Sequence, residues 1–382
     1  MKNNHSKNMT IPILIMILFL QIQLSCGNKT KSSGEEVPVS HTVLELNPSD
    51  DNPRNGEGDF ITLKDGRILF IYSHFTGGAG DHASGLLAGR YSDDGGKSWS
   101  DEDVIYFTNE SGLNLMSVSL LRLNNGDIAL FYLRKNSVTD CRPVLRISSD
   151  EGKIWSEEMM CIPDRIGYFV LNNDRVIQLE NGRLIAPVAQ HAAPDMEWTG
   201  HGVIQALFSD DNGSTWNASE IPANPDSVTL QEPGVVALKD GRIMMFMRNN
   251  SGFQYLSYSS DQGETWTPAE VSIIRSPRSP ATIERIPSTG DLLLVWNNNG
   301  GEDPATAGLR TPFNAAVSKD DGVTWDPIRT LADDPDGWYC YTAFEFVGEH
   351  VLLAHSAGNR KENNGLAVCH ISRVSLDWMY GL

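Results

Sequence analysis

Apolar and polar residues alternate over short stretches along most of the chain, and glycine interrupts the alternation. In residues 61–70, for example, an alternating run leads to a turn centred on Gly66 and continues as the apolar run Ile68 to Phe70. A period of two predicts a β-strand buried on one face, and a glycine between two such runs predicts a hairpin. Because no stretch beyond the N-terminal segment has a helical period, the pattern predicts an all-β fold.

Two motifs recur along the chain. Glycine-centred turns occur at intervals of 49 to 60 residues, at Gly66, Gly126, Gly182, Gly241, Gly290 and Gly348. An aspartate motif, Ser-x-Asp-x-Gly-x-x-Trp, occurs in five copies that begin at Ser92, Ser148, Ser209, Ser259 and Ser318. Its Ser and Asp side chains can accept hydrogen bonds from turn amides, its Gly supplies a positive φ, and its Trp can bury a large ring beside the hairpin.

The aspartates of this motif also invite comparison with a calcium-binding loop. An EF-hand loop requires glutamate at its twelfth position. Counted from Asp150, the twelfth residue is Cys161, and the other copies also lack glutamate there. We therefore interpret the motif as a structural turn rather than a calcium site.

The two motifs together predict the architecture. Each unit of 49 to 60 residues holds a hairpin with the glycine turn and, in the first five units, a second hairpin with the aspartate motif. Four strands per unit, repeated six times, predict a six-bladed β-propeller of four-stranded antiparallel blades. The last unit lacks the motif, so residues 40–46 are expected to supply its outer strand and close the ring. Residues 39–382 then form one domain, although the length alone would suggest several.

Composition and charge narrow the possible functions. Of 382 residues, 40% are hydrophobic, which allows a large core and excludes global disorder. The chain carries 49 acidic against 30 basic residues, for a net charge of −19. Such a surface repels phosphate backbones, so nucleic-acid binding is not expected, and an anionic ligand would need a local cluster of cations. Five cysteines are too few for a disulfide scaffold.

The first 26 residues are typical of a bacterial export signal. Lys2 and Lys7 precede a short apolar run from Ile11 to Leu20, and small residues follow. Cys26 stands where bacterial lipoproteins carry their lipid-modified cysteine. Residues 27–38 then form a flexible tether. We expect an exported protein, anchored at the periplasmic or outer-membrane surface through Cys26 or, alternatively, simply secreted. Contact with a membrane is expected only through the lipid.

Residues that precede the first strand or follow the second strand of each unit should meet at one rim of a propeller. For an acidic chain, these positions hold many cations, and guanidinium groups bind carboxylates in a bidentate manner. The candidate site residues are Arg54, Asp81, His82, Arg134, Asn173, Asp174, Glu232, Arg248, Arg310, Tyr339 and Tyr341. Isolated histidines at strand ends are typical of structural groups, so neither a metal site nor a cofactor is expected.

These residues resemble the active-site motifs of the sialidases (neuraminidases) of glycoside hydrolase family 33. The segment from Gln231 to Leu238, followed by Met247-Arg248-Asn249, resembles the stretch in which a buried Glu precedes a carboxylate-binding Arg by one hairpin. The segment Tyr341-Thr342-Ala343-Phe344 resembles the one that carries the nucleophile. Arg54, Arg310 and Asp81 match the family's remaining positions, although Arg54 is followed by Asn instead of the usual Ile-Pro. The resemblance covers essentially the whole mature chain.

The resemblance implies a retaining exo-α-sialidase that acts on sialylated glycans or related 2-keto acid sugars. Arg54, Arg248 and Arg310 would bind the sugar carboxylate. Tyr341 would be the nucleophile, Glu232 would take its proton, and Asp81 would be the acid/base, with a pKa raised by partial desolvation. Tyr339 competes with Tyr341, because residues two apart on a strand point the same way.

The other candidates, Arg134, Asn173 and Asp174, would contact the rest of the sugar, and His82 adjoins Asp81. Two alternatives remain open at this point. One is a propeller glycosidase or lyase that acts on uronate-containing polysaccharide. The other is a non-catalytic carbohydrate-binding propeller.

Overall fold

The structure, a computed structural model, describes residues 1, 40–109 and 112–382. The predicted lipidation position Cys26 and the tether 27–38 lie outside these residues. From Ser40 onward the described chain forms twenty-five strands and one short helix within one compact unit, which confirms the all-β prediction. No helix among the described residues has the length and apolar character that crossing a membrane requires.

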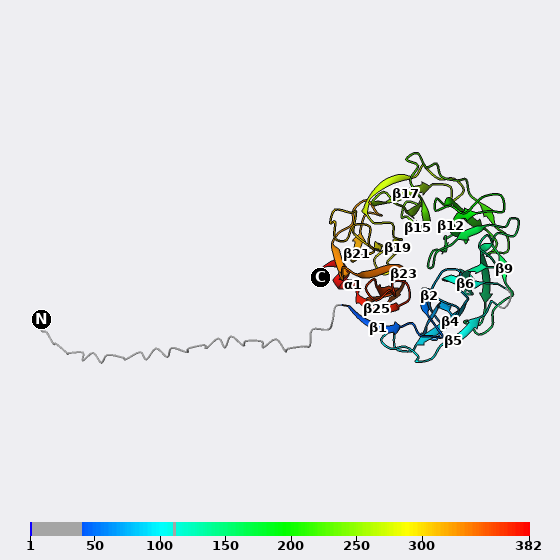
Figure 1. Cartoon of the computed structure of the whole chain (residues 1–382). Helices are drawn as coiled ribbons and strands as arrows, with labels where there is room; N and C mark the ends of the chain where they lie inside the picture. The colour runs from blue at the N-terminus through cyan, green and yellow to red at the C-terminus, as the bar shows by residue number, and fades with distance from the viewer. Residues whose placement is uncertain (2–39, 110–111) are drawn as a thin grey trace. The chain divides into compact units, whose positions relative to one another are not determined.

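The strands form five sheets that follow one another in chain order around a common centre (Figure 1). The first sheet contains β2 (Arg54–Thr62), β3 (Ile68–Phe75), β4 (Gly85–Ser92) and β5 (Val104–Phe107). The second contains β6 (Asn114–Arg122), β7 (Ile128–Lys135), β8 (Cys141–Ser148), β9 (Met159–Met160), β10 (Tyr168–Val170), β11 (Ile177–Gln178), β12 (Leu184–Ala192), β13 (Val203–Ser209) and β14 (Asn217–Ala218).

The remaining three sheets have four strands each. The third contains β15 (Gln231–Ala237), β16 (Ile243–Arg248), β17 (Phe253–Ser259) and β18 (Glu270–Arg275). The fourth contains β19 (Thr282–Arg285), β20 (Leu292–Trp296), β21 (Phe313–Ser318) and β22 (Ile328–Ala332). The fifth contains β23 (Gly337–Val347), β24 (His350–Asn359), β25 (Cys369–Ser375) and β1 (Ser40–Leu46).

The nine-stranded second sheet explains why five sheets are present where the repeats predict six blades. Its two halves, β6 to β9 and β10 to β14, are joined by a single parallel residue pair, Tyr168 with Cys141. Neighbouring strands within each half are antiparallel, as in the other sheets.

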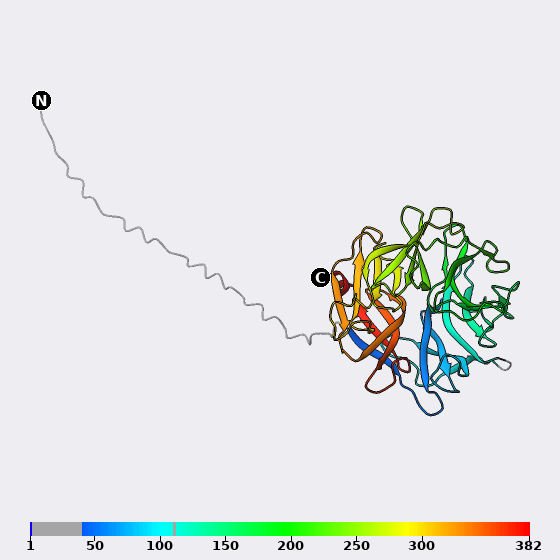
Figure 2. The same ribbon diagram turned by 45° about the horizontal axis from the view of Figure 1, so that its top comes forward.

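Strands from both ends of the described chain share the fifth sheet. β1 pairs antiparallel with β25 and is the outermost strand of this sheet, as predicted for residues 40–46. Figure 2 shows the blue β1 beside the red C-terminal strands from a second direction. The helix α1 (Leu376–Tyr380) follows β25 and was not predicted, because five residues are too few to show a helical period.

Both recurrent motifs form the turns that the sequence predicts. The six glycines of the hairpin turns all have positive φ. In the third aspartate motif, Asp211 Oδ1 accepts from the Thr215 amide at 2.8 Å and Oδ2 accepts from the Thr215 hydroxyl at 2.6 Å. These hydrogen bonds lower the pKa of Asp211. The Asp211 carboxylate thus accepts hydrogen bonds from its own turn. Among the described residues, no group of acidic, His and Cys side chains is arranged to hold a metal ion.

The core lies between successive sheets. The motif tryptophan Trp216, for example, packs edge-on against Phe131, with ring centroids 5.9 Å apart. The four described cysteines, Cys141, Cys161, Cys340 and Cys369, are buried and unpaired. A packed all-β scaffold of this kind holds the ends of the innermost strands in fixed positions, and these ends carry the site.

Candidate active site

A β-bulge recurs in the first strand of several sheets. The pairing register shifts between Gln231 and Pro233 in β15, and between Cys340 and Ala343 in β23. Comparable shifts occur in β2 and β6. Each bulge holds a non-glycine residue in the left-handed region: Glu57 (φ 52°), Ser117 (φ 60°), Glu232 (φ 43°) and Tyr341 (φ 56°). Such residues are costly and concentrate at functional sites.

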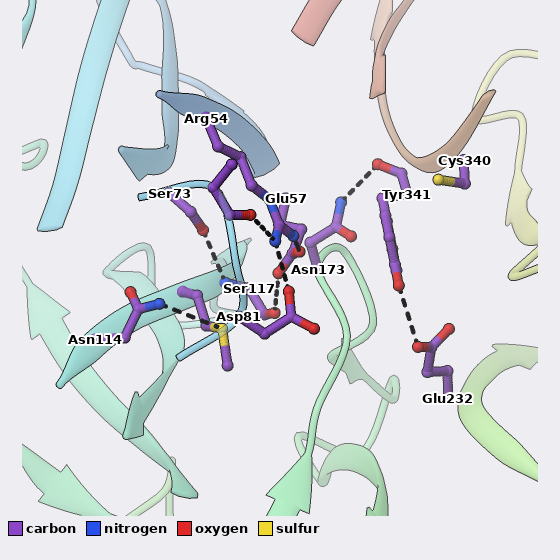
Figure 3. Close-up of polar contacts among 12 residues, drawn as sticks. Arg54, Glu57, Ser73, Asp81, Asn114, Ser117, Asn173, Glu232, Cys340 and Tyr341 are labelled. Atoms are coloured by element: carbon purple, nitrogen blue, oxygen red, sulfur yellow. Dashed lines mark hydrogen bonds and ion pairs between the residues drawn. The ribbon is translucent and has the colours of Figure 1, made fainter. Parts of the chain in front are cut away.

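Tyr341 and Glu232 contact each other across the centre of the fold (Figure 3). The phenolic hydroxyl donates to Glu232 Oε1 at 3.2 Å, and Arg248 Nη1 donates to the same oxygen at 2.5 Å. Burial raises the pKa of Tyr341, and the negative charge of Glu232 adds to this effect. Burial also acts to raise the pKa of Glu232, but Arg248 and Arg310 hold it below its ordinary value. The free site therefore pairs a neutral phenol with a carboxylate.

Arg310 precedes β21 and lies beside the tyrosine ring. Its guanidinium is 5.3 Å from the centroid of the Tyr341 ring and 5.2 Å from that of Trp338. Its Nη1 donates to Cys340 Sγ at 2.8 Å. Burial alone would lower the pKa of Arg310, but the groups around it, Cys340 first, raise it. Arg310 is thus a permanent cation, held by the residue next to Tyr341 in sequence.

Arg54 opens β2 and makes two ion pairs. Its Nη2 donates to Glu57 Oε1 and its Nη1 to Asp81 Oδ1, both at 2.5 Å. Its guanidinium also lies 4.5 Å from the centroid of the Phe75 ring. Figure 3 shows Glu57 and Asp81 gathered around this guanidinium. Burial acts to lower the pKa of Arg54, but the two carboxylates raise it overall.

Two of the three predicted arginines lie directly beside the Tyr341 phenol. Arg248 bonds to the carboxylate that accepts from the Tyr341 hydroxyl, and the Arg310 guanidinium lies 5.3 Å from the centroid of the Tyr341 ring. Arg54 is linked to this group only electrostatically, because an ionised Tyr341 would raise the pKa of Arg54. The Nε atoms of Arg54 and Arg248 are buried and have no hydrogen-bond partner within the part of the chain that the structure describes. Three stretches that are distant in sequence therefore form one cationic site.

The structure corrects the prediction for the pKa of Asp81. Asp81 lies in the loop between β3 and β4 with 62% of its side chain exposed. Partial burial acts to raise its pKa, as predicted from the loop, but attraction to Arg54 outweighs this and lowers it. In the free protein Asp81 is thus an ionised partner of Arg54. Its neighbour His82 is exposed on the same loop.

Two other predicted positions have different environments from those expected. A regular strand would point Tyr339 and Tyr341 the same way, but Tyr341 lies within the bulge that follows Cys340, and the two rings have separate partners. Tyr339 stacks on Phe313, with centroids 5.5 Å apart. Arg134 forms an ion pair with Glu158, so it is the next residue along β7 that reaches the site.

Asn173 and Asp174 bond to the strand that carries Tyr341. Asn173 is fully buried, and its Nδ2 donates to the carbonyl of Tyr341 at 3.1 Å. Asp174 Oδ2 accepts from the amide of Phe344 at 3.1 Å. Both side chains thus support the backbone of β23, and the contact with the substrate expected for them stays a prediction.

Two further residues belong to this site. Glu57 is three positions after Arg54, in the bulge of β2, and also accepts from the Ser117 hydroxyl at 2.6 Å. Lys135 is fully buried at the end of β7 and donates to the backbone carbonyl of Asp81 at 2.7 Å. The pairing of Glu57 with Arg54 depends on the bulge. Glycines within a strand can mark such a bulge, and Gly56 and Gly58 flank Glu57 in β2. The signal for Lys135 was its place next to the candidate Arg134, at the strand end that carries the site.

A second cluster of carboxylates lies further along the inner strands. A cavity of about 310 Å³ is lined in part by Asp59, Asp174, Glu284 and Glu345. Burial raises the pKa of all four carboxyl groups. Asp59 is hydrogen-bonded to the amides of Phe60 and Leu120, both at 2.7 Å. These contacts connect β2 with β6 and give the cluster a structural role.

Comparisons with known proteins identify a family and several relatives named as sialidases. The family described as BNR repeat-like domain matches residues 86–351. A sialidase of Bacteroides fragilis is 26% identical over 220 residues, which cover 55% of this chain and 38% of that protein. A sialidase of Micromonospora viridifaciens is 25% identical over 346 residues, which cover 79% of this chain and 50% of that protein. The chain thus spans half or less of the length of these two curated relatives.

Solved structures share the fold. The microbial sialidase Hz136 from the Hadza superimposes with a TM-score of 0.69 at 19% identity, covering 86% of this chain and 67% of that one. At this level of identity the likeness concerns the fold alone.

Proposed function

The chain belongs to the BNR repeat-like domain family, and from this membership and the site around Tyr341 we propose that it is a retaining exo-α-sialidase. The observation that carries the proposal is the phenol of Tyr341, which is hydrogen-bonded to Glu232 and flanked by the guanidinium groups of Arg248 and Arg310. The sialidases among its relatives support the same class of reaction at a general level.

The arginines suit the C1 carboxylate of a 2-keto sugar acid. Planar guanidinium groups bind carboxylates through parallel hydrogen bonds, and their effect is strongest when they are buried. Arg248 and Arg310 are held beside Tyr341 by Glu232 and Cys340. The buried Nε groups of Arg54 and Arg248 have no acceptor within residues 40–109 and 112–382, and an anionic ligand would supply one.

In the first half of the reaction, the Tyr341 oxygen attacks the anomeric carbon, and the bond from that carbon to the leaving oxygen breaks. Glu232 takes the phenolic proton through the hydrogen bond that already joins the two residues. Asp81 donates a proton to the leaving oxygen. A neutral phenol suits this step, because the substrate carboxylate on the same carbon would repel an anionic nucleophile.

In the second half, water attacks the anomeric carbon and the bond to the Tyr341 oxygen breaks. Asp81, now ionised, takes a proton from the water, and Glu232 returns its proton to Tyr341. Two displacements at one carbon give retention of configuration. Sialidases with a tyrosine nucleophile are a known exception to the two-carboxylate rule of glycosidases.

Substrate binding can supply the acid form of Asp81. In the free protein Arg54 attracts the Asp81 carboxylate and lowers its pKa. A substrate carboxylate that binds Arg54 compensates this cation and adds a negative charge close to Asp81. Both changes raise the pKa of Asp81. The ion pair between Arg54 and Asp81 is therefore exchanged for one between Arg54 and the substrate.

The scaffold of this site is proposed to be a six-bladed β-propeller. The two halves of the nine-stranded sheet would be separate blades that share the pair Tyr168 with Cys141. The other four sheets would be one blade each, with β1 completing the last. Four strands per sheet and the bulges at comparable places in β2, β6, β15 and β23 support this count.

The decisive experiment combines turnover with trapping of the nucleophile. Release of a fluorescent aglycone from a 2-O-aryl sialoside tests the activity. Incubation with a 2,3-difluoro sialic acid, followed by peptide mass spectrometry, should then place one added sugar on Tyr341. A protein that cleaves uronate polymers but no sialoside would exclude the proposal. One that binds sialylated glycans without turnover would also exclude it and would indicate a binding module.

We also propose that the protein is exported and lipid-anchored through Cys26, so that it acts on glycans outside the cytoplasm. The motivation is the charged, apolar and small-residue order of residues 1–26. Metabolic labelling with an alkyne fatty acid in a bacterial host should label the wild type and leave Cys26→Ser unlabelled. Equal labelling of both would exclude the anchor.

A further inference from the structure

Lys135 has a fully buried side chain, 0% exposed, at the end of β7. An ammonium group is rarely buried completely, because its desolvation is costly unless its donors are paired. Here Nζ donates to the backbone carbonyl of Asp81 at 2.7 Å and to the hydroxyl of Tyr168 at 3.0 Å. It also lies 4.9 Å from the centroid of the Tyr168 ring. These contacts fix the position of the cation.

The loop that Lys135 contacts is rich in glycine. Residues 76–84 join β3 to β4 and include Gly77, Gly78 and Gly80. The hydrogen bonds within the loop include the Thr76 amide to the Ser84 carbonyl, 2.8 Å, and the Ala83 amide to the Gly80 carbonyl, 2.9 Å. Because glycine allows many backbone conformations, contacts from outside the loop decide where Asp81 stands.

Arg54 and Lys135 provide such contacts, and they differ in what they bind. Arg54 donates to the carbonyl of Ala79 at 3.3 Å and to the carboxylate of Asp81. In the proposed reaction Arg54 must release this carboxylate when the substrate arrives. Lys135 binds the carbonyl of Asp81, which takes no part in the chemistry, so this contact can persist through the catalytic cycle.

The backbone that carries Lys135 is itself held on two sides. Lys135 pairs with Asn114 in β6 and with Cys141 in β8. Its carbonyl also accepts from the amide of Leu113 at 2.8 Å. The ammonium therefore extends from a fixed strand end to a loop with few constraints of its own.

We propose that Lys135 is a positioning residue. It holds Asp81 beside the leaving oxygen after the substrate carboxylate has replaced the Asp81 carboxylate as the partner of Arg54. The inference rests on the function proposed above. Without the Lys135 contact, proton donation from Asp81 to the leaving oxygen should be slower, whereas the arginines, Tyr341 and Glu232 remain in place. The defect should consequently be largest for substrates whose leaving oxygen needs a proton.

The test compares two leaving groups in Lys135→Met, which keeps an unbranched side chain one atom shorter and removes the donors. The 4-nitrophenolate of a 2-O-(4-nitrophenyl) sialoside leaves with little need for a proton, so kcat/KM of Lys135→Met on this substrate should change by about 3-fold or less. Sialyllactose has an alkoxide-like leaving group, and kcat/KM should fall at least about 10-fold further, within the range of general acid catalysis. Arg134→Gln changes the adjacent cation on the same strand, which pairs with Glu158, and should leave the ratio of the two substrates unchanged.

Hydrogen exchange of residues 76–84 supplies a readout that does not need activity. Exchange in this loop should be faster in Lys135→Met than in the wild type, and unaltered in Arg134→Gln. Wild-type exchange together with a wild-type ratio of the two substrates would overturn the proposal, as would an equal loss on both substrates. If Lys135→Met does not fold, Lys135→Gln goes through the same assays. A wild type that is inactive on both sialosides would refute the proposed function, and hydrogen exchange would still decide whether Lys135 holds the loop.

Discussion

The phenolic oxygen of Tyr341 lies 3.2 Å from Oε1 of Glu232, although the two residues are 109 positions apart in the chain. Burial and the charge of Glu232 keep the phenol protonated, while Arg248 keeps Glu232 ionised. The nucleophile therefore forms by proton transfer within this hydrogen bond during the reaction. The pair also fixes the direction in which the tyrosine oxygen points.

Replacing Tyr341 with phenylalanine removes the nucleophilic oxygen and keeps the ring against Arg310. We expect kcat on an aryl sialoside to fall by a factor of about 10³ or more. Binding of a sialic acid analogue, measured by titration calorimetry, should change by less than about 10-fold, because the arginines remain.

Tyr339→Phe is the matched control for this change. Its ring stacks on Phe313, away from Glu232, so kcat should stay within about 2-fold of the wild type. If Tyr339→Phe were the inactive variant and Tyr341→Phe the active one, the assignment of the nucleophile would be reversed.

The pH dependence should differ between the free protein and the substrate complex. Partial burial raises the pKa of Asp81 and Arg54 lowers it, with a net decrease in the free protein. Because kcat/KM follows the free protein and the acid step needs protonated Asp81, kcat/KM on sialyllactose should decline as the pH rises from acid values. In the complex the substrate has replaced Asp81 at Arg54, so the decline in kcat should lie at higher pH. Because the free-protein limb lies below pH 3.8, the rate profiles must extend from about pH 3 to about pH 8 to cover both limbs. Coincident limbs would contradict the exchange of partners at Arg54.

Cys340 should contribute to substrate binding through Arg310. Its sulfur accepts a hydrogen bond from Nη1 at 2.8 Å, and Cys340→Ala leaves this buried donor without its partner. We expect KM to rise about 5- to 10-fold with kcat within about 2-fold, as for an interaction made equally in the ground and transition states. Cys340→Ser keeps an acceptor and should restore most of the affinity. Michaelis kinetics of the two variants provide the check, and a wild-type KM in Cys340→Ala would show that Arg310 does not need this contact.

Glu345 should make the fold less stable as the pH rises. Burial, with a further contribution from Asp174, raises its pKa to about 7, above the ordinary 4.5. The folded state thus binds this proton more tightly than the unfolded chain does. The free energy of unfolding should therefore decrease between about pH 4.5 and pH 7, by about 1 to 3 kcal/mol from this group.

Urea unfolding at both ends of this pH range measures the effect. Glu345→Gln should flatten the dependence, whereas Glu180→Gln, on the exposed surface, should not. An unchanged slope in Glu345→Gln would assign the pH dependence to the other carboxylates of the cavity, Asp59, Asp174 and Glu284.

The sequence was sufficient for the strand content and for the principal site residues. Alternation and glycine turns depend on local chemistry, which a single chain displays directly. Arg54, Glu232, Arg248, Arg310 and Tyr341 could be named because their local motifs resemble one family. The structure places Glu232, Arg248 and Arg310 beside Tyr341.

Features that depend on strand register could not be predicted from local sequence motifs. A shift of one residue moves a side chain to the opposite face of a strand, which separates Lys135 from Arg134. The bulges in β2 and β23 change the direction of Glu57 and Tyr341. Gly56 and Gly58 flank Glu57, but no glycine adjoins Tyr341 to mark the second bulge. The lowered pKa of Asp81 depends on Arg54, a contact over 27 positions that its own glycine-rich loop does not indicate.

The pairing of β1 with β25 has a consequence for biogenesis. A polypeptide synthesised or translocated from its N-terminus cannot assemble the fifth sheet until its last strand has emerged. Proteolytic loss of residues 40–46 would in turn leave the outer edge of β25 without a partner, and an unpaired edge is a template for aggregation. β1, the first strand to be synthesised, is thus among the last strands to find its partner.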